Sequence, residues 1–469
     1  MINVQKQTGA KMPVGKERSY QEVVEFLNQH WLEGRSSLDQ MKKLDKELGF
    51  PSKAVKTIFV GGNNGKSLTI HFTARLLKEE GLKVGSLINP HILTYNERIS
   101  VNQETINNQL FTALANEVIA ASESVKITPH SQEILTLMAL LYFKQQGVDV
   151  ALLETSTKSH FWDPINICMP IVLGITRVTD QHPETNSIQE TIEKLLSIAQ
   201  NETWVVSADQ SKLNLEAMLE FINKHGSRWA MPIRKLAPLE HPYEQLHGRC
   251  AALAERIAHL FTNNVLIENS TIVQDSLLVK QKGKRGRPTL EKKRQNELNP
   301  QRTLEEFWEG VSTEQPGRFQ VLEKEKPLVL LDNASNLDGL QNVLLGIKLL
   351  HYQRTFKGFT LIIGSRSACL NSPEFAKMIR YFFKKVSGNL IICPVNPITP
   401  EVNADIKINF DQLVLDLKAM KVKVRFVEDF AQAFDSVLKV IDKNNGLVAI
   451  TGSDAIVSQY WSRKGINTF

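Results

Sequence analysis

The chain has 469 residues, of which 42% are hydrophobic and 23% charged, a composition that allows about two to four domains with a sizeable buried core. The longest apolar stretches are too short to cross a membrane, the N-terminal segment lacks the apolar core of a signal peptide, and the four separate cysteines argue against a disulfide framework or a cysteine-based zinc site. The formal charge of +6 does not indicate a general nucleic-acid-binding surface, because the segment 280–294 alone carries eight basic residues and one acid and leaves the rest of the chain slightly acidic. We therefore expect a soluble cytoplasmic protein with no membrane partner.

The first half of the chain alternates strand and helix patterns. A β-branched run at 57–60 predicts a strand, the glycine- and asparagine-rich segment 61–65 a tight loop, and the apolar spacing of 67–80 a helix. This alternation predicts an α/β fold with a mostly parallel, doubly wound sheet. Further strands are predicted at 84–88, 148–154, 171–176 and 203–207, and further helices at 132–146 and 188–199.

A second, smaller α/β unit is predicted from residue 316 to the end of the chain. Between the two units lies a basic stretch without periodicity, which predicts a disordered insertion. We therefore divide the chain into a first domain at 1–277, an insertion at 278–315 and a second domain at 316–469. Strands of the second domain are predicted at 328–331, 360–363, 389–393, 423–427 and 447–451.

The loop between the first strand and helix has the features of a phosphate cradle. Glycines let backbone amides approach phosphate oxygens, the helix N-terminus adds a favourable dipole, and Lys66 would neutralise the outer phosphates. The spacing departs from GxxxxGK[ST], because residue 60 is valine. We interpret the loop as a phosphate-binding site, with an ordinary glycine turn before a helix as the alternative.

Two motifs resemble those of a known family. The segments VGGNNGKSLT (60–69) and INPHILTYNERISVNQETI (88–106) are similar to conserved motifs of the folylpolyglutamate and dihydrofolate synthases, within the Mur ligase superfamily. The resemblance implies a Mur-ligase-type ATP-binding domain with a mostly parallel sheet, followed by a smaller Rossmann-like C-terminal α/β domain. It extends through VDVALLE (148–154), GITRVTDQH (174–182), PGRFQVL (316–322), LVLLDNASN (328–336) and AITGSDAIV (449–457).

The resemblance also implies an activity, that of an ATP-dependent ligase of folate biosynthesis and one-carbon metabolism. ATP would phosphorylate a carboxylate of a pterin-containing substrate, and the amine of L-glutamate would attack the acyl phosphate. Phosphoryl transfer of this kind needs positioning and charge neutralisation. The implied cofactors are ATP and Mg²⁺, the implied substrates are folate or dihydropteroate and L-glutamate, and the implied state is a monomer.

The candidate site residues follow from the matched motifs. Lys66 would contact the β- and γ-phosphates, and Glu154 and His182, each near the carboxyl end of a predicted strand, would hold Mg²⁺. Asn89 stands where the family has another metal ligand. The predicted catalytic residues are Lys66, Glu154 and His182, the predicted metal ligands are Asn89, Glu154 and His182, and the predicted nucleotide-binding residues are Gly62, Asn63, Asn64, Gly65, Lys66, Ser67, Arg318, Asp332 and Asn336.

Several of these residues have a structural alternative. Glu154 is also compatible with an ordinary strand-end carboxylate, His182 with a loop histidine, and Asp332 with a cap for the following helix. These alternatives stay open at the level of the sequence. A structural loop and a substrate contact are both compatible with His91, Asn96, Glu97 and Arg98.

The sequence departs from the family where catalysis is expected. Leu68 stands at the position of a metal-binding hydroxyl, so that Ser67 or Thr69 would have to supply it, and Ser335 and Ala199 stand near positions of a histidine and a lysine. The loop after Glu154 has lost the family's glycines, and with them the freedom to adopt positive φ. The alternative hypothesis is therefore a catalytically impaired paralogue with a binding role.

The basic insertion offers one further candidate. The segment KRGRP (284–288) resembles the core of an AT-hook, in which arginines enter the narrow minor groove of A·T-rich DNA. Because the match is short and lies in a lysine-rich stretch, we interpret it as a solvated linker, with DNA association through 280–294 as the alternative.

Overall fold

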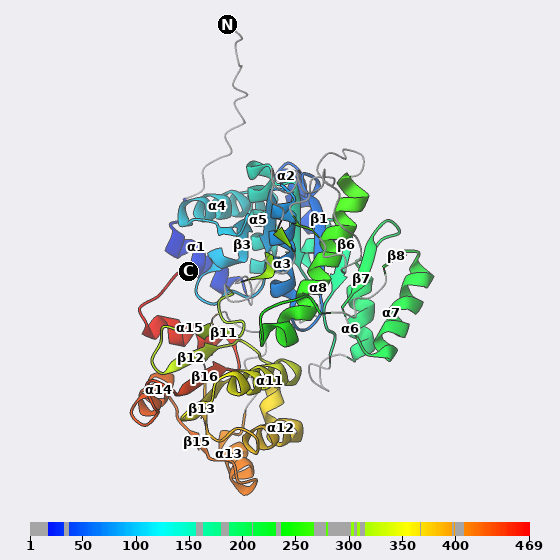
Figure 1. Ribbon diagram of the computed structural model, residues 1–469. Coiled ribbons are helices and arrows are strands. Elements are labelled where there is room, and N and C mark those ends of the chain that lie inside the picture. The colour runs from blue at the N-terminus through cyan, green and yellow to red at the C-terminus, as the bar shows by residue number, and fades with distance from the viewer. Residues whose placement is uncertain are drawn as a thin grey trace.

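The computed structural model describes residues 17–31, 37–155, 163–179, 187–208, 210–230, 236–266, 278–279, 302–303, 307–309, 315–365, 367–395, 398 and 408–469. Two large β-sheets with flanking helices make up most of this part of the chain (Figure 1), and a third sheet has only two parallel strands, β9 (Leu278–Val279) and β10 (Arg302–Thr303). His182 and the basic segment 280–294 lie outside the described residues. Within the ranges given, no helix combines the length and the hydrophobicity that a membrane crossing requires.

The first sheet has eight strands in the order β4-β3-β2-β5-β1-β6-β7-β8. The central strand β1 (Lys56–Gly61) pairs in parallel with β5 (Val150–Glu154) on one side and β6 (Pro170–Ile175) on the other. Antiparallel pairing occurs at one edge, among β2, β3 and β4. The predicted doubly wound, mostly parallel sheet is thus confirmed. The remaining strands are β2 (Val84–Leu87), β3 (Ile99–Val101), β4 (Glu104–Thr105), β7 (Trp204–Ser207) and β8 (Arg228–Trp229).

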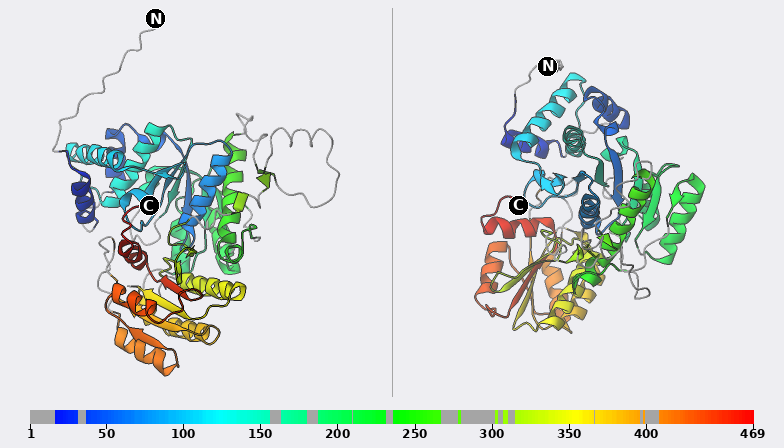
Figure 2. Two further views of the ribbon diagram at one scale, coloured as in Figure 1. Left: turned by 60° about the vertical axis from the view of Figure 1, so that its left-hand side comes forward. Right: turned by 45° about the horizontal axis from the view of Figure 1, so that its top comes forward.

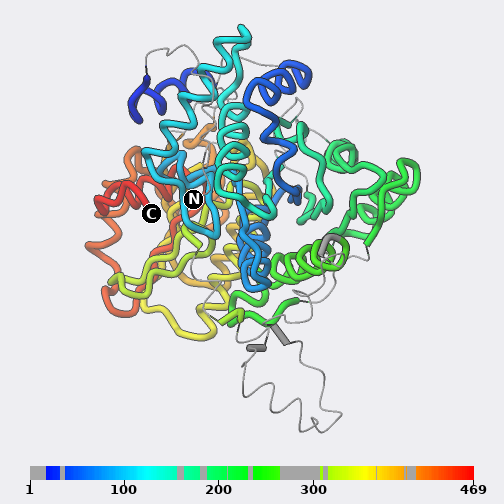
Figure 3. The backbone as a smooth tube through the Cα atoms, turned by 90° about the horizontal axis from the view of Figure 1, so that it is seen from above, coloured from blue at the N-terminus to red at the C-terminus, as the bar shows by residue number. Residues whose placement is uncertain are grey.

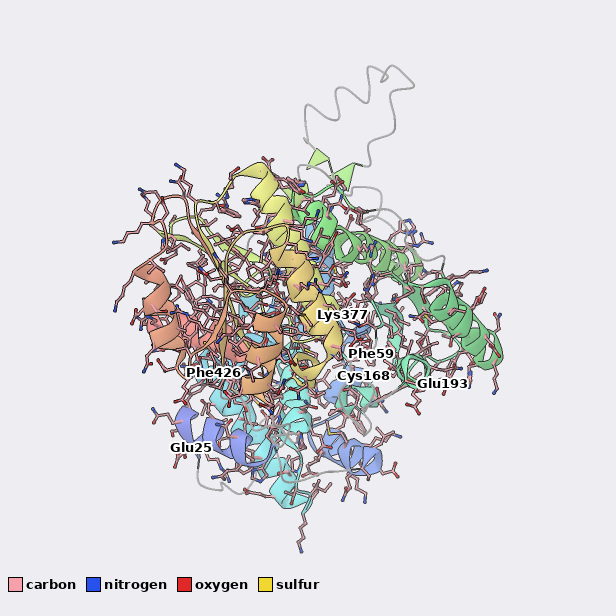
Figure 4. All side chains as sticks on the ribbon, turned by 90° about the horizontal axis from the view of Figure 1, so that it is seen from below. Glu25, Phe59, Cys168, Glu193, Lys377 and Phe426 are labelled. Atoms are coloured by element: carbon pink, nitrogen blue, oxygen red, sulfur yellow. The ribbon has the colours of Figure 1, made fainter. Side chains whose placement is uncertain are left out.

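Alternating side chains of β1 face two different apolar clusters. Ile58 and Val60 pack in the cluster that contains α3 (Lys66–Glu79) and α8 (Tyr243–Phe261), whereas Phe59 packs in the cluster on the opposite face. Figure 4 places Phe59 inside the outline of the molecule and Glu25 at its edge. Figure 2 shows α3 and α8 side by side against the sheet. The opposite face is covered by α1 (Tyr20–Gln29), α2 (Leu38–Glu47), α4 (Asn108–Ser124), α5 (Ser131–Gln146), α6 (Ile188–Leu196) and α7 (Lys212–His225).

The second sheet has six strands in the order β11-β12-β16-β13-β14-β15. Its edge strand β11 (Gln320–Leu322) runs antiparallel to β12 (Leu328–Leu331), and the other pairs are parallel. This smaller α/β sheet agrees with the predicted C-terminal fold. Its other elements are α11 (Leu337–Gln353), β13 (Phe359–Gly364), α12 (Pro373–Phe383), β14 (Asn389–Cys393), α13 (Phe410–Ala419), β15 (Val424–Phe426), α14 (Phe430–Leu438), β16 (Leu447–Thr451) and α15 (Asp454–Arg463).

Apolar side chains join the two sheet-containing regions. The rings of Tyr243 in α8 and Phe319 before β11 meet edge to face, with their centroids 6.0 Å apart. Phe319 is packed against Gly346 of α11, where a Cβ atom would lie 2.3 Å from the ring. Ile92, from the first region, is buried in the apolar cluster of the second sheet. Figure 3 shows the C-terminal region, yellow to red, beneath the first half of the chain.

Candidate active site

The loop of residues 61–65, named the phosphate loop for its predicted role, joins β1 to α3 in a conformation that requires glycine. Gly62 has φ +122° and Gly65 has φ +88°, and a Cβ atom on Gly62 would lie 2.2 Å from the hydroxyl oxygen of Thr176. Gly65 is the N-cap of α3 and provides no side-chain hydrogen bond to the first turn. The backbone amides of this turn therefore have no side-chain cap, which is the arrangement that binds phosphate at a helix N-terminus.

The end of β6 holds the phosphate loop from the other side. The backbone amides of Asn63 and Asn64 donate to the carbonyl oxygen of Arg177, over 2.9 and 3.5 Å. The side-chain oxygen of Asn63 accepts a hydrogen bond from the backbone amide of Thr179 at 3.0 Å. Asn63 therefore attaches the loop to the segment that follows β6, the strand next to β1 in the sheet.

Glu154, at the carboxyl end of β5, is the centre of the polar contacts below the loop. Its carboxylate is 3% exposed and lies 3.6 Å from the ammonium nitrogen of Lys66. It accepts hydrogen bonds from the hydroxyl of Ser67 at 2.8 Å and from the backbone amide of Asn89 at 3.2 Å. Because the carboxyl ends of β1 and β5 are adjacent, a strand-end acid and the first residues of α3 meet in space although they are far apart in sequence.

The structure distinguishes between the two hydroxyls that were candidates to replace the missing one at residue 68. Leu68 is buried in the apolar cluster between α3 and the sheet. Thr69 is fully buried and donates its hydroxyl to the carbonyl oxygen of Gly65 at 2.8 Å. Only Ser67, of these three residues, directs its hydroxyl to Glu154. Ser67 therefore provides the hydroxyl that a cation bound to the Glu154 carboxylate could contact.

The oxygen atoms around Glu154 fit a hard divalent cation. A carboxylate and a neighbouring hydroxyl are the ligand types that Mg²⁺ uses beside substrate phosphates. The side-chain oxygen of Asn89 accepts a hydrogen bond from Arg98 at 2.5 Å, so it would keep that bond with one lone pair while offering the other to a cation. That Asn89 and His182 are metal ligands stays a prediction. No group of three or more His, Cys, Asp or Glu side chains suited to a metal occurs in the part of the chain that the structure describes.

The residues 91–98 form a tightly bonded structural loop. The Arg98 guanidinium is buried and donates to His91 Nδ1 at 2.8 Å. The Glu97 carboxylate accepts three backbone amides, from Ile92, Leu93 and Thr94. The Asn96 amide donates to the carbonyl of Ile106 at 2.9 Å. Of the two alternatives for this motif, these contacts favour the structural one.

In the second sheet-containing region, Asp332 shapes a loop from its place after β12. Its carboxylate accepts the backbone amides of Phe319 at 2.8 Å and Ala334 at 2.7 Å. Burial raises the pKa of Asp332 to about 6, against the lowering effect of these two amides and of Arg318. Asp332 thus ties the backbone directly after Arg318 to the loop that follows β12. The cap of α11 is Asn336, which accepts from the amide of Gly339 at 2.9 Å. Nucleotide binding by Asp332 and Arg318 stays a prediction.

The phosphate loop bonds directly to the first turn of α11. The Asn64 amide donates to Asn336 at 3.1 Å and to Asp338 at 2.8 Å, and it accepts from Asn336 at 2.8 Å. The carboxylate of Asp338 also pairs with the Arg177 guanidinium at 2.9 Å. The structure therefore brings together residues 62–67, Glu154, Asn89 and Asn336, as expected. The sequence analysis did not include Arg177 and Asp338 among the site residues. For Arg177 a signal was present, because this charged residue directly follows the predicted buried strand 171–176.

Two buried histidines near the site predict acid sensitivity. Burial and Arg98 lower the pKa of His91 well below its usual value, and burial and Arg318 lower the pKa of His247, in α8, to about 4. Both histidines are neutral in the folded chain, whereas in the unfolded chain they bind protons below about pH 6.5. The free energy of unfolding therefore decreases as the pH falls from 6.5 to 4.

The free energy of unfolding, measured with urea, should decrease between pH 7 and pH 4.5 by about 2 kcal/mol less in His247→Gln than in the parent chain. The exposed His225→Gln serves as control and should behave like the parent; equal losses in all three proteins would contradict the prediction.

The chain is similar to known proteins along most of its length. It is 28% identical over 332 residues to the dihydrofolate synthase/folylpolyglutamate synthase of Bacillus subtilis (strain 168), covering 67% of this chain and 74% of the relative. The fold matches Mycobacterium tuberculosis folylpolyglutamate synthase complexed with ADP, with a TM-score of 0.72 and 17% identity over 95% of this chain and 98% of that one. It also matches the bifunctional synthase of Yersinia pestis complexed with AMPPNP and a Mn ion, with a TM-score of 0.71 and 18% identity over 97% and 100% of the two chains. No family model matches the chain.

Proposed function

We propose that this chain, a divergent member of the folylpolyglutamate and dihydrofolate synthases, is an ATP-dependent ligase that joins L-glutamate to the carboxylate of a folate or of dihydropteroate. The similarity to the Bacillus subtilis enzyme supports the activity, because it covers most of both chains. One observation in the structure carries the proposal. An uncapped helix N-terminus, Lys66, Ser67 and Glu154 meet at one point, beside the loops of the second sheet-containing region.

The reaction proceeds in two transfers. A carboxylate oxygen of the acceptor attacks the γ-phosphorus of ATP, the bond to the bridging oxygen breaks, and ADP leaves. The amine of L-glutamate then attacks the acyl carbon, phosphate leaves with the electron pair of the broken C–O bond, and the amine releases a proton to solvent. Most of the catalysis in phosphoryl transfer is positioning and charge neutralisation.

The described residues have distinct tasks in this scheme. The amides at the start of α3 bind the phosphates, and Lys66 moves from Glu154 to the β- and γ-phosphate oxygens. Glu154 and Ser67 would hold Mg²⁺, which would supply charge neutralisation at the transferring phosphoryl group. We assign Arg318 to the ATP phosphates, with Asp332 holding its backbone in place.

The same proposal includes the remaining predictions from the sequence. His182 and Asn89 would hold Mg²⁺ together with Glu154. The chain divides at 277 and 316, and it acts as a monomer on ATP, L-glutamate and a pterin substrate in the cytoplasm.

The test is phosphate release by the purified chain with ATP, Mg²⁺ and L-glutamate, with dihydropteroate or tetrahydrofolate added in turn. We expect release that requires both glutamate and one of the two pterins, and the pterin that supports it identifies the acceptor. Mass spectrometry of the product should show the addition of one glutamyl unit. Release that is indifferent to both pterins, or none at all from a folded protein, would overturn the proposal in favour of an impaired paralogue.

A further inference from the structure

Arg177 contacts two separate parts of the site through different groups. Its carbonyl oxygen accepts the backbone amides of Asn63 and Asn64, and so fixes the shape of the phosphate loop. Its guanidinium reaches Asp338, in the first turn of α11, at 2.9 Å. One residue at the end of β6 therefore holds the loop with its main chain and the C-terminal region with its side chain.

Asp338 makes the complementary pair of contacts. One carboxylate oxygen pairs with Arg177, and the other accepts from the side chain of Asn64 at 2.8 Å. The side chain of Asp338 is 16% exposed, whereas that of Arg177 is 46% exposed, so the carboxylate is shielded from water on the side of the loop. Charge-assisted hydrogen bonds in partly shielded positions are stronger than neutral ones.

Four residues, Arg177, Asp338, Asn64 and Asn336, form a network across the boundary between the two regions. Asn64 completes it with Asn336, because their amides exchange two hydrogen bonds, at 3.1 and 2.8 Å. All of these bonds to α11 are lost together if the C-terminal region moves away from the first sheet. The conformation of the phosphate loop and the position of α11 are therefore physically linked.

We propose that Arg177 and Asp338 are positioning residues that couple closure of the C-terminal region to the shape of the phosphate loop, and so set the affinity for ATP. The role in ATP affinity rests on the proposed function, but the coupling itself does not. Neither residue touches the reacting atoms. When Asp338 withdraws, Asn64 and Arg177 lose their partners in α11, and the loop amides that Arg177 orders become mobile.

Hydrogen exchange tests the coupling without any turnover. In Asp338→Ala, the amides of residues 60–67 should exchange about tenfold faster than in the parent, although the residue replaced belongs to the other region. The ATP dissociation constant, measured by calorimetry with ATP alone, should rise about tenfold. The value of kcat at saturating ATP should change by less than about twofold, because the lost contact acts on binding.

Matched variants separate coupling from general damage. Asp338→Asn keeps an acceptor for Asn64 but removes the charge, and we expect an intermediate effect. Arg354→Ala is the control, because it removes an ion pair with Glu323 that lies wholly within the C-terminal region. In the double variant Arg177→Ala/Asp338→Ala the effect on loop exchange should be less than the sum of the single effects, because the two residues share a contact.

The outcomes distinguish the two proposals. Loop exchange unchanged in both Asp338 variants, or raised equally by Arg354→Ala, would overturn the coupling. If the parent chain binds no ATP, the proposed ligase fails, yet faster loop exchange in Asp338→Ala would still establish the coupling.

Discussion

Replacing Lys66 by alanine should lower the rate of pterin-dependent phosphate release by about a thousandfold while the protein remains folded. Lys66 begins α3, and its side chain is 15% exposed, with the ammonium nitrogen 3.6 Å from Glu154 and 3.5 Å from the carbonyl oxygen of Asn63. In the described part of the chain, Lys66 is the one lysine in an ion pair with Glu154. In the proposed reaction, loss of this cation would leave the developing charge on the γ-phosphoryl group without the lysine that neutralises it.

The same substitution should have little effect on stability. Glu154 keeps the hydroxyl of Ser67 and the backbone amide of Asn89, so its carboxylate stays hydrogen-bonded. Lys78→Ala is the matched control, since Lys78 lies on the same helix, is exposed and contacts a carbonyl oxygen remote from Glu154. Steady-state phosphate release and thermal unfolding of both variants provide the measurement. A Lys66→Ala protein with more than about a tenth of the parental rate would contradict the assigned role.

Local patterns predicted most of the fold. The strand at 57–60, the turn at 61–65 and the helix at 67–80 correspond to β1, the phosphate loop and α3, because apolar periodicity and glycine placement are decided within a few residues. The strand ending at Glu154 was also expected, and its pairing beside β1 places the carboxylate under the loop. The short antiparallel strands β3 and β4 were not predicted, since such edge strands have little periodicity of their own.

Contacts between distant segments could not be predicted from the sequence. Nothing in the segment 61–65 shows that Asn63 faces β6 while Asn64 faces α11, because this depends on which elements the fold places on each side. The choice between Ser67 and Thr69 likewise follows from the direction of each side chain on α3. The sequence left a structural loop and a substrate contact open for the motif 91–98, and only the structure shows its polar side chains bonded to the backbone and to one another.

Replacing Arg98 by alanine should destabilise the fold by about 3–5 kcal/mol, a large part of the stability of an ordinary domain. Arg98 is 1% exposed, and its guanidinium carbon lies 4.9 Å from the ring centre of Trp31 and 5.3 Å from that of Tyr95. Burial lowers the pKa of Arg98 to about 10, so it is still charged at neutral pH. Alanine would leave a cavity beside the two rings.

The substitution would also remove the donor from two acceptors, the buried His91 Nδ1 and the half-buried side-chain oxygen of Asn89. In the described part of the chain, no other side-chain donor reaches either atom. Arg98→Lys keeps the charge but lacks the planar fork that serves both acceptors, so we expect it to recover only part of the loss. Arg228→Ala is the control, because the Arg228 guanidinium also lies over an aromatic ring but is exposed and pairs with Glu202, and its removal should cost less than about 1 kcal/mol. Equal losses for Arg98→Ala and Arg228→Ala in urea unfolding would show that burial of the guanidinium does not set its contribution. A large loss for Arg98→Ala alone would show that the buried guanidinium holds Asn89 in position, and Asn89 in turn donates its backbone amide to Glu154.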